Sequence, residues 1–217
     1  MKIEISENRP EYFKENWPGQ YDVFSHFEFA CGIPSALFAI TTLKENGKPN
    51  VSFNAWSSFT GDGSGFYAVI PSMLHRTHTY KNILRTGEFV INFINKDYFD
   101  ACKATISDND DETDEFEVGN FTKEQAGTVS CPRIKEAFLC LECKLEKEIA
   151  LNEKAVSSIM IGRVQHIAAQ EEYAKGIDGK YGDDGFMLNI HNPYDLVTGE
   201  GKGSAVAVLK VVRRNED

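Results

Sequence analysis

The sequence lacks a long apolar run, a secretory leader and any glycine-rich nucleotide fingerprint. None of its apolar stretches approaches the roughly 18–20 residues that a membrane-spanning helix needs. The opening stretch, MKIEISENRPEYFKEN, is charged and contains no apolar core of a signal peptide. Neither a GxGxxG turn nor a P-loop occurs. We therefore expect a cytoplasmic protein without a membrane segment.

Basic residues are in deficit, with 23 Lys and Arg against 33 Asp and Glu and a net charge of −10. This balance argues against nucleic-acid binding, which draws its affinity from phosphates neutralised by cations. The 217 residues, 41% of them hydrophobic, are enough for a sizeable core. Because internal repeats and low-complexity linkers are also missing, we expect one domain over residues 1–217.

The cysteines are odd in number, and without a leader this favours free thiols over disulfides. They are Cys31, Cys102, Cys131, Cys140 and Cys143. The CxxC pair at 140–143 lies in a strand-like run, and neither a second CxxC nor a histidine pair completes a metal site. We interpret the cysteines as structural thiols, with a redox pair at 140–143 as the alternative, and expect no metal.

Signals of nucleophilic or acid–base catalysis are weak. The chain has no GxSxG motif, and His26, His166 and His191 have no identifiable partners. No catalytic residue is therefore assigned. A bound cofactor that carries its own chemistry would explain why the chain shows so little catalytic equipment.

The acidic run DNDDETDEFE, residues 108–117, has seven carboxylates in ten positions. As a calcium loop it fails, because the sixth position is Thr113 instead of glycine and the twelfth is Gly119 instead of glutamate. Like charges in such a run usually remain exposed. The run is therefore predicted to be a solvated loop.

Strand patterns dominate the sequence, and Asn46-Gly47 is a strong hairpin signal between the first two. A third strand is expected to end at Pro71. A short helix is expected within 10–29. The predicted strands are 33–43, 51–59, 66–70, 88–94, 137–151, 157–169 and 204–212. Many strands with few helices and short turns indicate an antiparallel barrel or sandwich.

The window from Gly63 to Gly87 contains no Asp or Glu, although the chain is acidic. Its basic residues are His75, Arg76, His78, Lys81 and Arg85. A helix is predicted from a cap at Thr77 or Thr79 to a stop at Gly87, with Tyr80, Ile83 and Leu84 on one face.

The start of this helix has two open interpretations. A helix N-terminus beside hydroxyl groups and a guanidinium can bind a phosphate monoester. The groups in question belong to Ser72, Arg76, Thr77 and Thr79. A solvated basic helix paired with acidic neighbours is the alternative.

In the order of its segments the chain resembles the flavin reductase-like family, the FMN-binding split β-barrels that include flavoredoxins. The segments are ALFAITT, KENGKPN, VSFNAWSSF, FYAVI, RTHTYKNI and GEFVINF. The resemblance extends to the later segments DEFEVGNFTKEQA, ECKLEKEI and MIGRVQHI, and it covers about residues 30–170. It implies a mainly β fold, an antiparallel Greek-key split β-barrel with a few helices. The barrel core would then span about 30–170, with N- and C-terminal extensions in the same domain.

The resemblance also implies a bound FMN as the anion expected in the acid-free window. Its phosphate would be surrounded by Arg76, Thr77, His78 and Thr79. The flavin would be lined by Asn54, Ala55, Trp56 and Ser57, and Ser72 would reach the ribityl chain or the phosphate. The family resemblance further implies a homodimer with the flavin near the subunit interface.

Three functions follow from this resemblance. The first is an oxidoreductase, an NAD(P)H-dependent flavin reductase that transfers hydride from NADH or NADPH to the flavin. The alternative is a flavoredoxin-like FMN electron-transfer protein that receives electrons from a redox protein partner and has no pyridine-nucleotide site. The third is a barrel that has lost flavin and binds another phosphorylated ligand.

One segment departs from the family pattern. Many members carry a Ser-Gly-Arg-like stretch that contacts the flavin or the nicotinamide, and here ATISDNDDETDEF, residues 104–116, stands in its place. It has no arginine and is strongly acidic, so it disfavours NADPH, whose 2′-phosphate it would repel.

Overall fold

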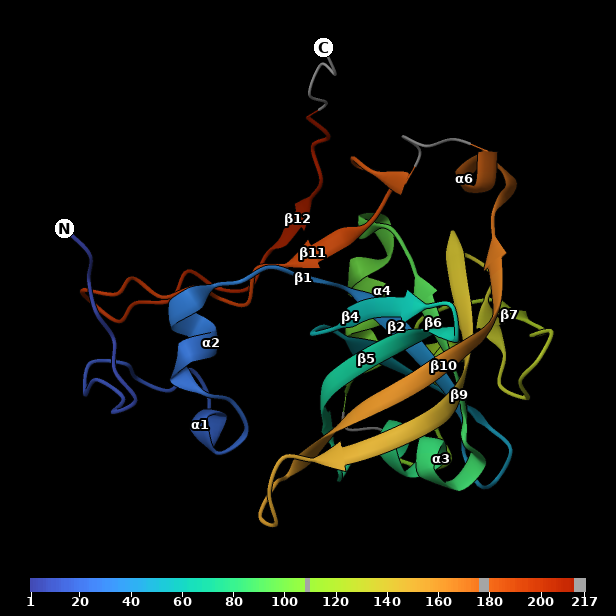
Figure 1. The fold of residues 1–217 in the computed structure, drawn as a ribbon, viewed down its shortest axis with the longest axis horizontal. Coiled ribbons are helices and arrows are strands. Elements are labelled where there is room, and N and C mark those ends of the chain that lie inside the picture. The colour runs from blue at the N-terminus through green and yellow to red at the C-terminus, as the bar shows by residue number, and fades with distance from the viewer. Residues whose placement is uncertain (108–109, 176–179, 213–217) are drawn as a thin grey trace. The chain divides into compact units, whose positions relative to one another are not determined.

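The computed structural model describes residues 1–107, 110–175 and 180–212, which form two compact units (Figure 1). The first contains Met1–Ser35 and Leu188–Ala207, and the second contains Ala36–Met187 and the chain from Val208. The single domain expected over 1–217 stays a prediction. None of the helices in the described ranges is long and apolar enough to cross a membrane.

The first unit is built on aromatic side chains around two short helices, α1 (Gln20–Val23) and α2 (His26–Cys31). Phe13 is buried, and its ring packs edge-on against Tyr194 with the centroids 5.2 Å apart. The predicted single helix within 10–29 is therefore two helices. The boundary between the units falls within the short strands β1 (Ser35–Ala36), β11 (Met187–Asn189) and β12 (Val206–Val208).

The second unit contains a seven-stranded antiparallel sheet in the order β3-β2-β6-β9-β10-β5-β4 (Figure 1). Its strands are β2 (Phe38–Leu43), β3 (Pro49–Asn54), β4 (Ser58–Asp62), β5 (Gly65–Leu74), β6 (Glu88–Phe93), β9 (Leu139–Ala150) and β10 (Ser157–Ala169). Strands β3 and β4 are the two ends of this order, so the sheet is not closed. This confirms the predicted mainly β, antiparallel split barrel.

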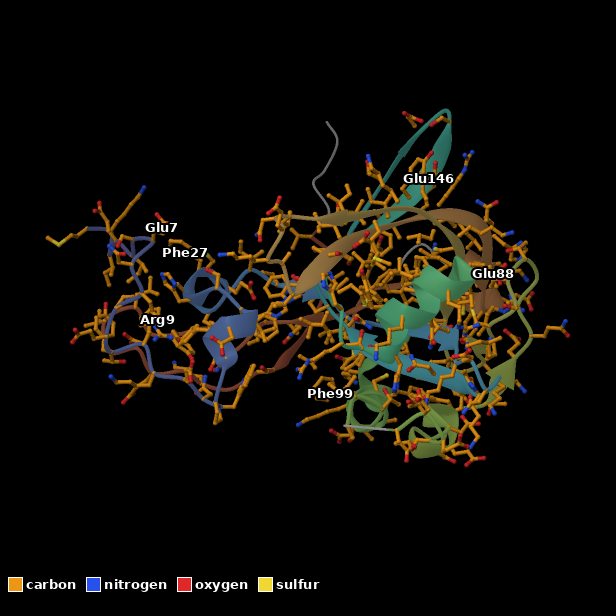
Figure 2. All side chains as sticks on the ribbon, turned by 90° about the horizontal axis from the view of Figure 1, so that it is seen from below. Glu7, Arg9, Phe27, Glu88, Phe99 and Glu146 are labelled. Carbon is orange, nitrogen blue, oxygen red and sulfur yellow. The ribbon has the colours of Figure 1, made fainter. Side chains whose placement is uncertain are left out.

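The remaining elements of the second unit are short. A two-stranded sheet pairs β7 (Lys123–Glu124) with β8 (Arg133–Ile134). The helices are α3 (His78–Thr86), the 3-10 turn η1 (Lys96–Tyr98), α4 (Phe99–Ala104), α5 (Glu115–Val118) and α6 (Glu171–Lys175). Phe99, labelled in Figure 2, packs its ring on Phe53 of β3 at 5.6 Å between centroids. Helix α4 is thereby attached to the β3 edge of the sheet.

The core lies within the second unit, where β6 is buried on both faces as predicted from its continuous apolar run. Phe38, Ile40, Ile91 and Met160 are fully buried members of this core. The hairpin predicted at Asn46-Gly47 joins β2 to β3. The predicted strand 204–212 is shortened to β12.

Gly162 is closely packed against this core. A methyl group at this position would lie 2.2 Å from Cζ of the fully buried Phe89 ring. We expect Gly162→Ala to lower the free energy of unfolding by about 1–3 kcal/mol, as overpacking does. Gly63→Ala is the matched control, because nothing lies within 4 Å of a methyl group there. Urea unfolding of both variants measures the difference, and equal stabilities would contradict the prediction.

Candidate functional site

Strand β3 contributes a face of polar side chains to the candidate site. Asn50, Ser52 and Asn54 alternate along the strand and therefore project from one face. Asn50 Nδ2 donates to Oγ1 of Thr79 over 3.0 Å, and both residues are buried. This bond fixes the first turn of α3 against β3. Asn54 lies at the other end of the strand, where its Nδ2 donates to the Ser52 carbonyl over 2.8 Å.

Helix α3 begins and ends close to where the sequence predicts. Thr77 is the N-cap: its Oγ1 accepts from the Tyr80 N–H over 3.2 Å and donates to the Leu74 carbonyl over 2.8 Å. Gly87 ends the helix in the left-handed region, with φ of 69°. Of the two predicted caps, Thr77 is correct and Thr79 is wrong, because Thr79 lies inside the first turn.

The buried face of α3 differs from the predicted one. Leu84 is 46% exposed, while Thr79, Asn82 and Ile83 are buried. Asn82 faces inward because its Nδ2 donates to Oγ1 of Thr42 on β2 over 3.0 Å. The helix is therefore held to the sheet by two amide–hydroxyl bonds as well as by apolar contacts.

The start of α3 offers backbone donors to an anion. The first N–H groups of a helix have no partner within it, and its N-terminus carries a partial positive charge. Thr77 caps the Tyr80 N–H, and among the described residues the N–H groups of His78 and Thr79 have no acceptor, which leaves them for a ligand. The side chain of Arg76 is exposed directly before the cap. The hydroxyls of Thr77 and Thr79 are already bonded within the protein, so these threonines contribute chiefly through the backbone.

Strand β5 continues through Pro71, so the predicted strand end at this residue is wrong. The cause is a β-bulge: Ser158 of β10 pairs with Met73 and Met160 pairs with Ile70, so Pro71 and Ser72 together lie opposite one residue. Ser72 has φ of 59° and is exposed. Bulges beside functional sites re-aim side chains in this way.

The predicted return strand 51–59 is interrupted at residues 55–57, which form loop 55–57 between β3 and β4. Trp56 in this loop has φ of 59°, an uncommon value for a bulky residue and one that clusters at functional sites. The Ser57 hydroxyl oxygen is buried and has no hydrogen-bond partner in the described ranges. Ser58 pairs with Val69, so loop 55–57, which precedes Ser58, lies beside the part of β5 that follows Val69 and leads into the bulge.

The predicted site residues lie in three segments of the second unit. Asn54 ends β3 and is followed by loop 55–57, which contains Ala55, Trp56 and Ser57; Ser72 lies on the β5 bulge; and Arg76, Thr77, His78 and Thr79 lie at the start of α3. The bond from Asn50 to Thr79 and the pairing of β4 with β5 connect these segments. Their contacts with a flavin stay a prediction.

Residues 110–115, which we call the acidic segment, are anchored instead of forming the predicted solvated loop. Nζ of Lys44 lies 3.0 Å from Oε1 of Glu115, and each side chain is only 2% exposed. The same ammonium group donates to the carbonyls of Thr113 and Asp110, over 2.6 and 3.0 Å. Burial raises the pKa of Glu115, and the Lys44 ammonium opposes this shift. Residues 108–109 of the predicted loop lie outside the described residues.

The acidic segment also reaches the start of α3. Nε2 of His78 lies 3.1 Å from Oδ1 of Asp111, and Nζ of Lys48 lies 2.9 Å from Oε2 of Glu112. The carboxylate of Asp111 is itself 77% exposed. The His78 ring is therefore directed toward a carboxylate, and negative charge lies beside the N-terminal end of the helix.

The other candidate groups fit structural roles. Cys140 and Cys143 are both buried. Because they are three positions apart on one strand, their side chains project from opposite faces of the sheet. Burial raises the pKa of the Cys140 thiol to about 12. These features support structural thiols against a redox pair. No cluster of three or more metal-ligating side chains occurs in the part of the chain that the structure describes.

His191, in the first unit, does have partners that the sequence did not reveal. Its Nε2 lies 2.5 Å from Oγ of Ser35, and its Nδ1 lies 2.9 Å from Nδ2 of Asn189. Oδ1 of Asn189 accepts from the His191 backbone N–H, so its Nδ2 must be the donor to Nδ1. Nε2 then carries the ring proton and cannot accept one from Ser35. Burial lowers the pKa of His191 to about 4, which keeps the ring neutral, so this pair is not an activated nucleophile.

Sequence analysis missed Asn50, Lys44 and Asp111. The alternation of polar residues at 50, 52 and 54 was a usable signal for the first of these. The other two act through partners that are distant in the chain, so nothing local marks them.

The chain is similar to known proteins over most of its length. A model described as "Flavin reductase like domain" matches residues 30–185. An uncharacterized protein of Aquifex aeolicus is 38% identical over 78 residues, which span 36% of this chain and 40% of that protein. Nitrilotriacetate monooxygenase component B from Bacillus cereus has a TM-score of 0.73 at 18% identity, covering 99% of this chain and 98% of that one.

Flavoredoxin of Desulfovibrio vulgaris (Miyazaki F) has a TM-score of 0.62 at 18% identity, covering 84% of this chain and 90% of that one. At such identities the two structures establish a shared fold. The family match covers well over half of the chain, including every element of the candidate site. The chain belongs to the flavin reductase-like family.

Proposed function

We propose that the protein is an FMN-binding oxidoreductase, a flavin reductase that uses a reduced pyridine nucleotide as its electron donor. The observation that carries this proposal is the start of α3. It combines free helix N–H groups, the exposed guanidinium of Arg76 and a firm attachment to β3 through Asn50 and Thr79. This arrangement suits a phosphate monoester, and the family match makes flavin mononucleotide its natural source.

The groups present fit FMN in both of its parts. Arg76, Ser72 and the backbone N–H groups of His78 and Thr79 would hold the phosphate. Asn54, Ala55, Trp56 and Ser57 would line the flavin ring. The unpartnered Ser57 hydroxyl supports this assignment, because a buried hydroxyl without a partner is costly unless a ligand satisfies it. When bound, the flavin supplies the redox chemistry, and the chain supplies binding, orientation and exclusion of water.

The acidic segment favours NADH over NADPH as the donor. Asp111 and Glu112 carry exposed carboxylates next to the start of α3. A ligand with an additional phosphate would meet their repulsion there. We also propose that the protein acts in the cytoplasm, as expected from the sequence, and that it is a homodimer, as the family resemblance implies.

The second candidate is a flavoredoxin-like electron carrier that binds FMN without a pyridine-nucleotide site. The observation that favours it is the composition of residues 104–116, which contain no arginine. Such a protein would receive its electrons from a redox partner protein.

Anaerobic absorption spectroscopy of the purified protein, loaded with FMN if necessary, separates the two candidates. We expect flavin bands that bleach promptly when NADH is added and more slowly with an equal concentration of NADPH. Bands that bleach only with dithionite would replace the reductase by the electron carrier. A colourless protein that does not take up FMN would overturn both candidates and leave a site for another phosphorylated ligand.

A further inference from the structure

A chain of hydrogen bonds lies behind the turn that joins β5 to α3. Nε2 of His75 lies 2.7 Å from Oγ of Ser158, a buried residue of β10. Ser158 Oγ in turn donates to Oε1 of Glu148 on β9, and the Tyr80 hydroxyl donates to the same carboxylate oxygen over 3.2 Å. The His75 and Tyr80 rings pack together with their centroids 4.6 Å apart. Four segments of the second unit thus meet around one imidazole.

The direction of each bond follows from the number of protons available. A carboxylate can only accept a hydrogen bond, so the single hydroxyl proton of Ser158 is donated to Glu148. The Ser158 oxygen must then accept from His75, which places a proton on Nε2. The two nitrogens of an imidazole point in divergent directions. With Nε2 bonded to a buried serine, Nδ1 is the ring nitrogen that has no partner among the described residues.

The backbone fixes the same residue. The His75 N–H donates to the Val156 carbonyl over 3.0 Å, which ties the turn to the chain just before β10. His75 lies between the β5 bulge at Ser72 and the N-cap at Thr77, and it directly precedes Arg76. The backbone of His75 therefore lies in the short stretch that contains three of the proposed phosphate contacts, Ser72, Arg76 and Thr77.

We propose that His75 is an additional phosphate-binding residue, acting through Nδ1, and that Ser158 and Glu148 are the positioning residues that orient its ring. This inference rests on the proposed FMN function and deepens it. The charged and titratable groups facing the ring are Glu148 on β9 and Tyr80 on α3, with Arg76 adjacent in the chain. An imidazole that carries both protons donates from both nitrogens, so in that form Nδ1 can donate to a phosphate oxygen while Nε2 keeps its bond to Ser158.

Comparison of FMN with riboflavin isolates the phosphate contact, because riboflavin lacks only that group. The apparent Kd of each ligand is measured by fluorescence quenching for the wild-type protein and for His75→Phe. Phenylalanine retains the ring packing on Tyr80 but has no nitrogen. We expect FMN affinity to fall about 10-fold or more, the size of a lost charge-assisted contact, with riboflavin affinity unchanged.

Two variants test the positioning residues. Ser158→Ala leaves His75 in place but removes the bond that orients it, and we expect a smaller loss confined to FMN. Ser158→Thr keeps the hydroxyl and is expected to restore the wild-type ratio of FMN to riboflavin affinity. His166→Asn is the matched control, because His166 is an exposed histidine eight positions farther along β10. It should not change either affinity.

The outcomes separate this inference from the proposed function. If the wild-type protein binds neither flavin, the proposed function fails, and the inference fails with it. If it binds FMN more tightly than riboflavin and His75→Phe leaves that ratio unchanged, only the assignment of His75 is overturned. A parallel loss of both affinities in His75→Phe would show a general structural role and would equally overturn it. Should the Ser158 variants not fold, His75→Phe still decides the question.

Discussion

Lys44→Met is expected to lower the free energy of unfolding by about 3–5 kcal/mol, the usual effect of breaking a buried ion pair from one side. The ammonium group of Lys44 lies 3.0 Å from the Glu115 carboxylate, and both side chains are almost fully buried. Methionine fills a similar volume but leaves the Glu115 charge without a counterion. Two backbone carbonyls, at Asp110 and Thr113, also lose their donor. Chemical unfolding in urea measures the loss.

Two comparisons make this result specific. Lys48→Met removes a surface ion pair with Glu112 and should cost at most about 1 kcal/mol. Lys44→Met combined with Glu115→Leu replaces both buried charges and should recover much of the lost stability. A loss below about 1 kcal/mol for Lys44→Met alone would contradict the prediction. It would mean that the acidic segment contributes little to the stability of the second unit.

Arg76→Ala is expected to weaken FMN binding by about 1.5–3 kcal/mol, which corresponds to roughly 10- to 150-fold in Kd. The guanidinium is exposed directly before the α3 cap, so its removal should change ligand binding without disturbing the fold. Calorimetric titration with FMN gives the affinity, and thermal unfolding without ligand tests the second expectation.

Arg85→Ala provides the control for net charge. Arg85 is exposed and lies near the other end of α3, nine residues farther along, or roughly 14 Å along the helix axis. If both variants weaken FMN binding equally, the effect is one of general electrostatics. If neither weakens it, the phosphate is not held at the start of α3.

The fold was largely predictable because its signals are local. Asn46-Gly47 specifies a hairpin by its own backbone preferences, and Thr77 and Gly87 bound a helix through capping. The apolar run of β6 predicts burial on both faces without knowledge of its neighbours. Each of these features depends on residues within about one turn or one strand.

The site was predictable only in part, because several of its features depend on distant pairing. Pro71 reads as a strand end until the partner strand is known, and the bulge then shows how β5 continues past it. The acidic segment reads as solvated because its principal counterion, Lys44, is about 70 positions away in the chain. His75 has no helical or strand pattern of its own. Its partners come from two later strands, and only the register of β9 with β10 places Glu148 near Ser158.

The bulge in β5 has a consequence for the alternation of side chains along that strand. Before the bulge, the even-numbered residues Ala68 and Ile70 are buried, whereas after it the odd-numbered Met73 is buried. Pro71 and Ser72 therefore shift the inside–outside phase of the chain by one residue. If the chain passed through Pro71 and Ser72 as a regular ladder without the bulge, Met73 would turn toward solvent and the whole approach to α3 would rotate by half a period. The parity of a single strand thus decides which residues reach the proposed phosphate.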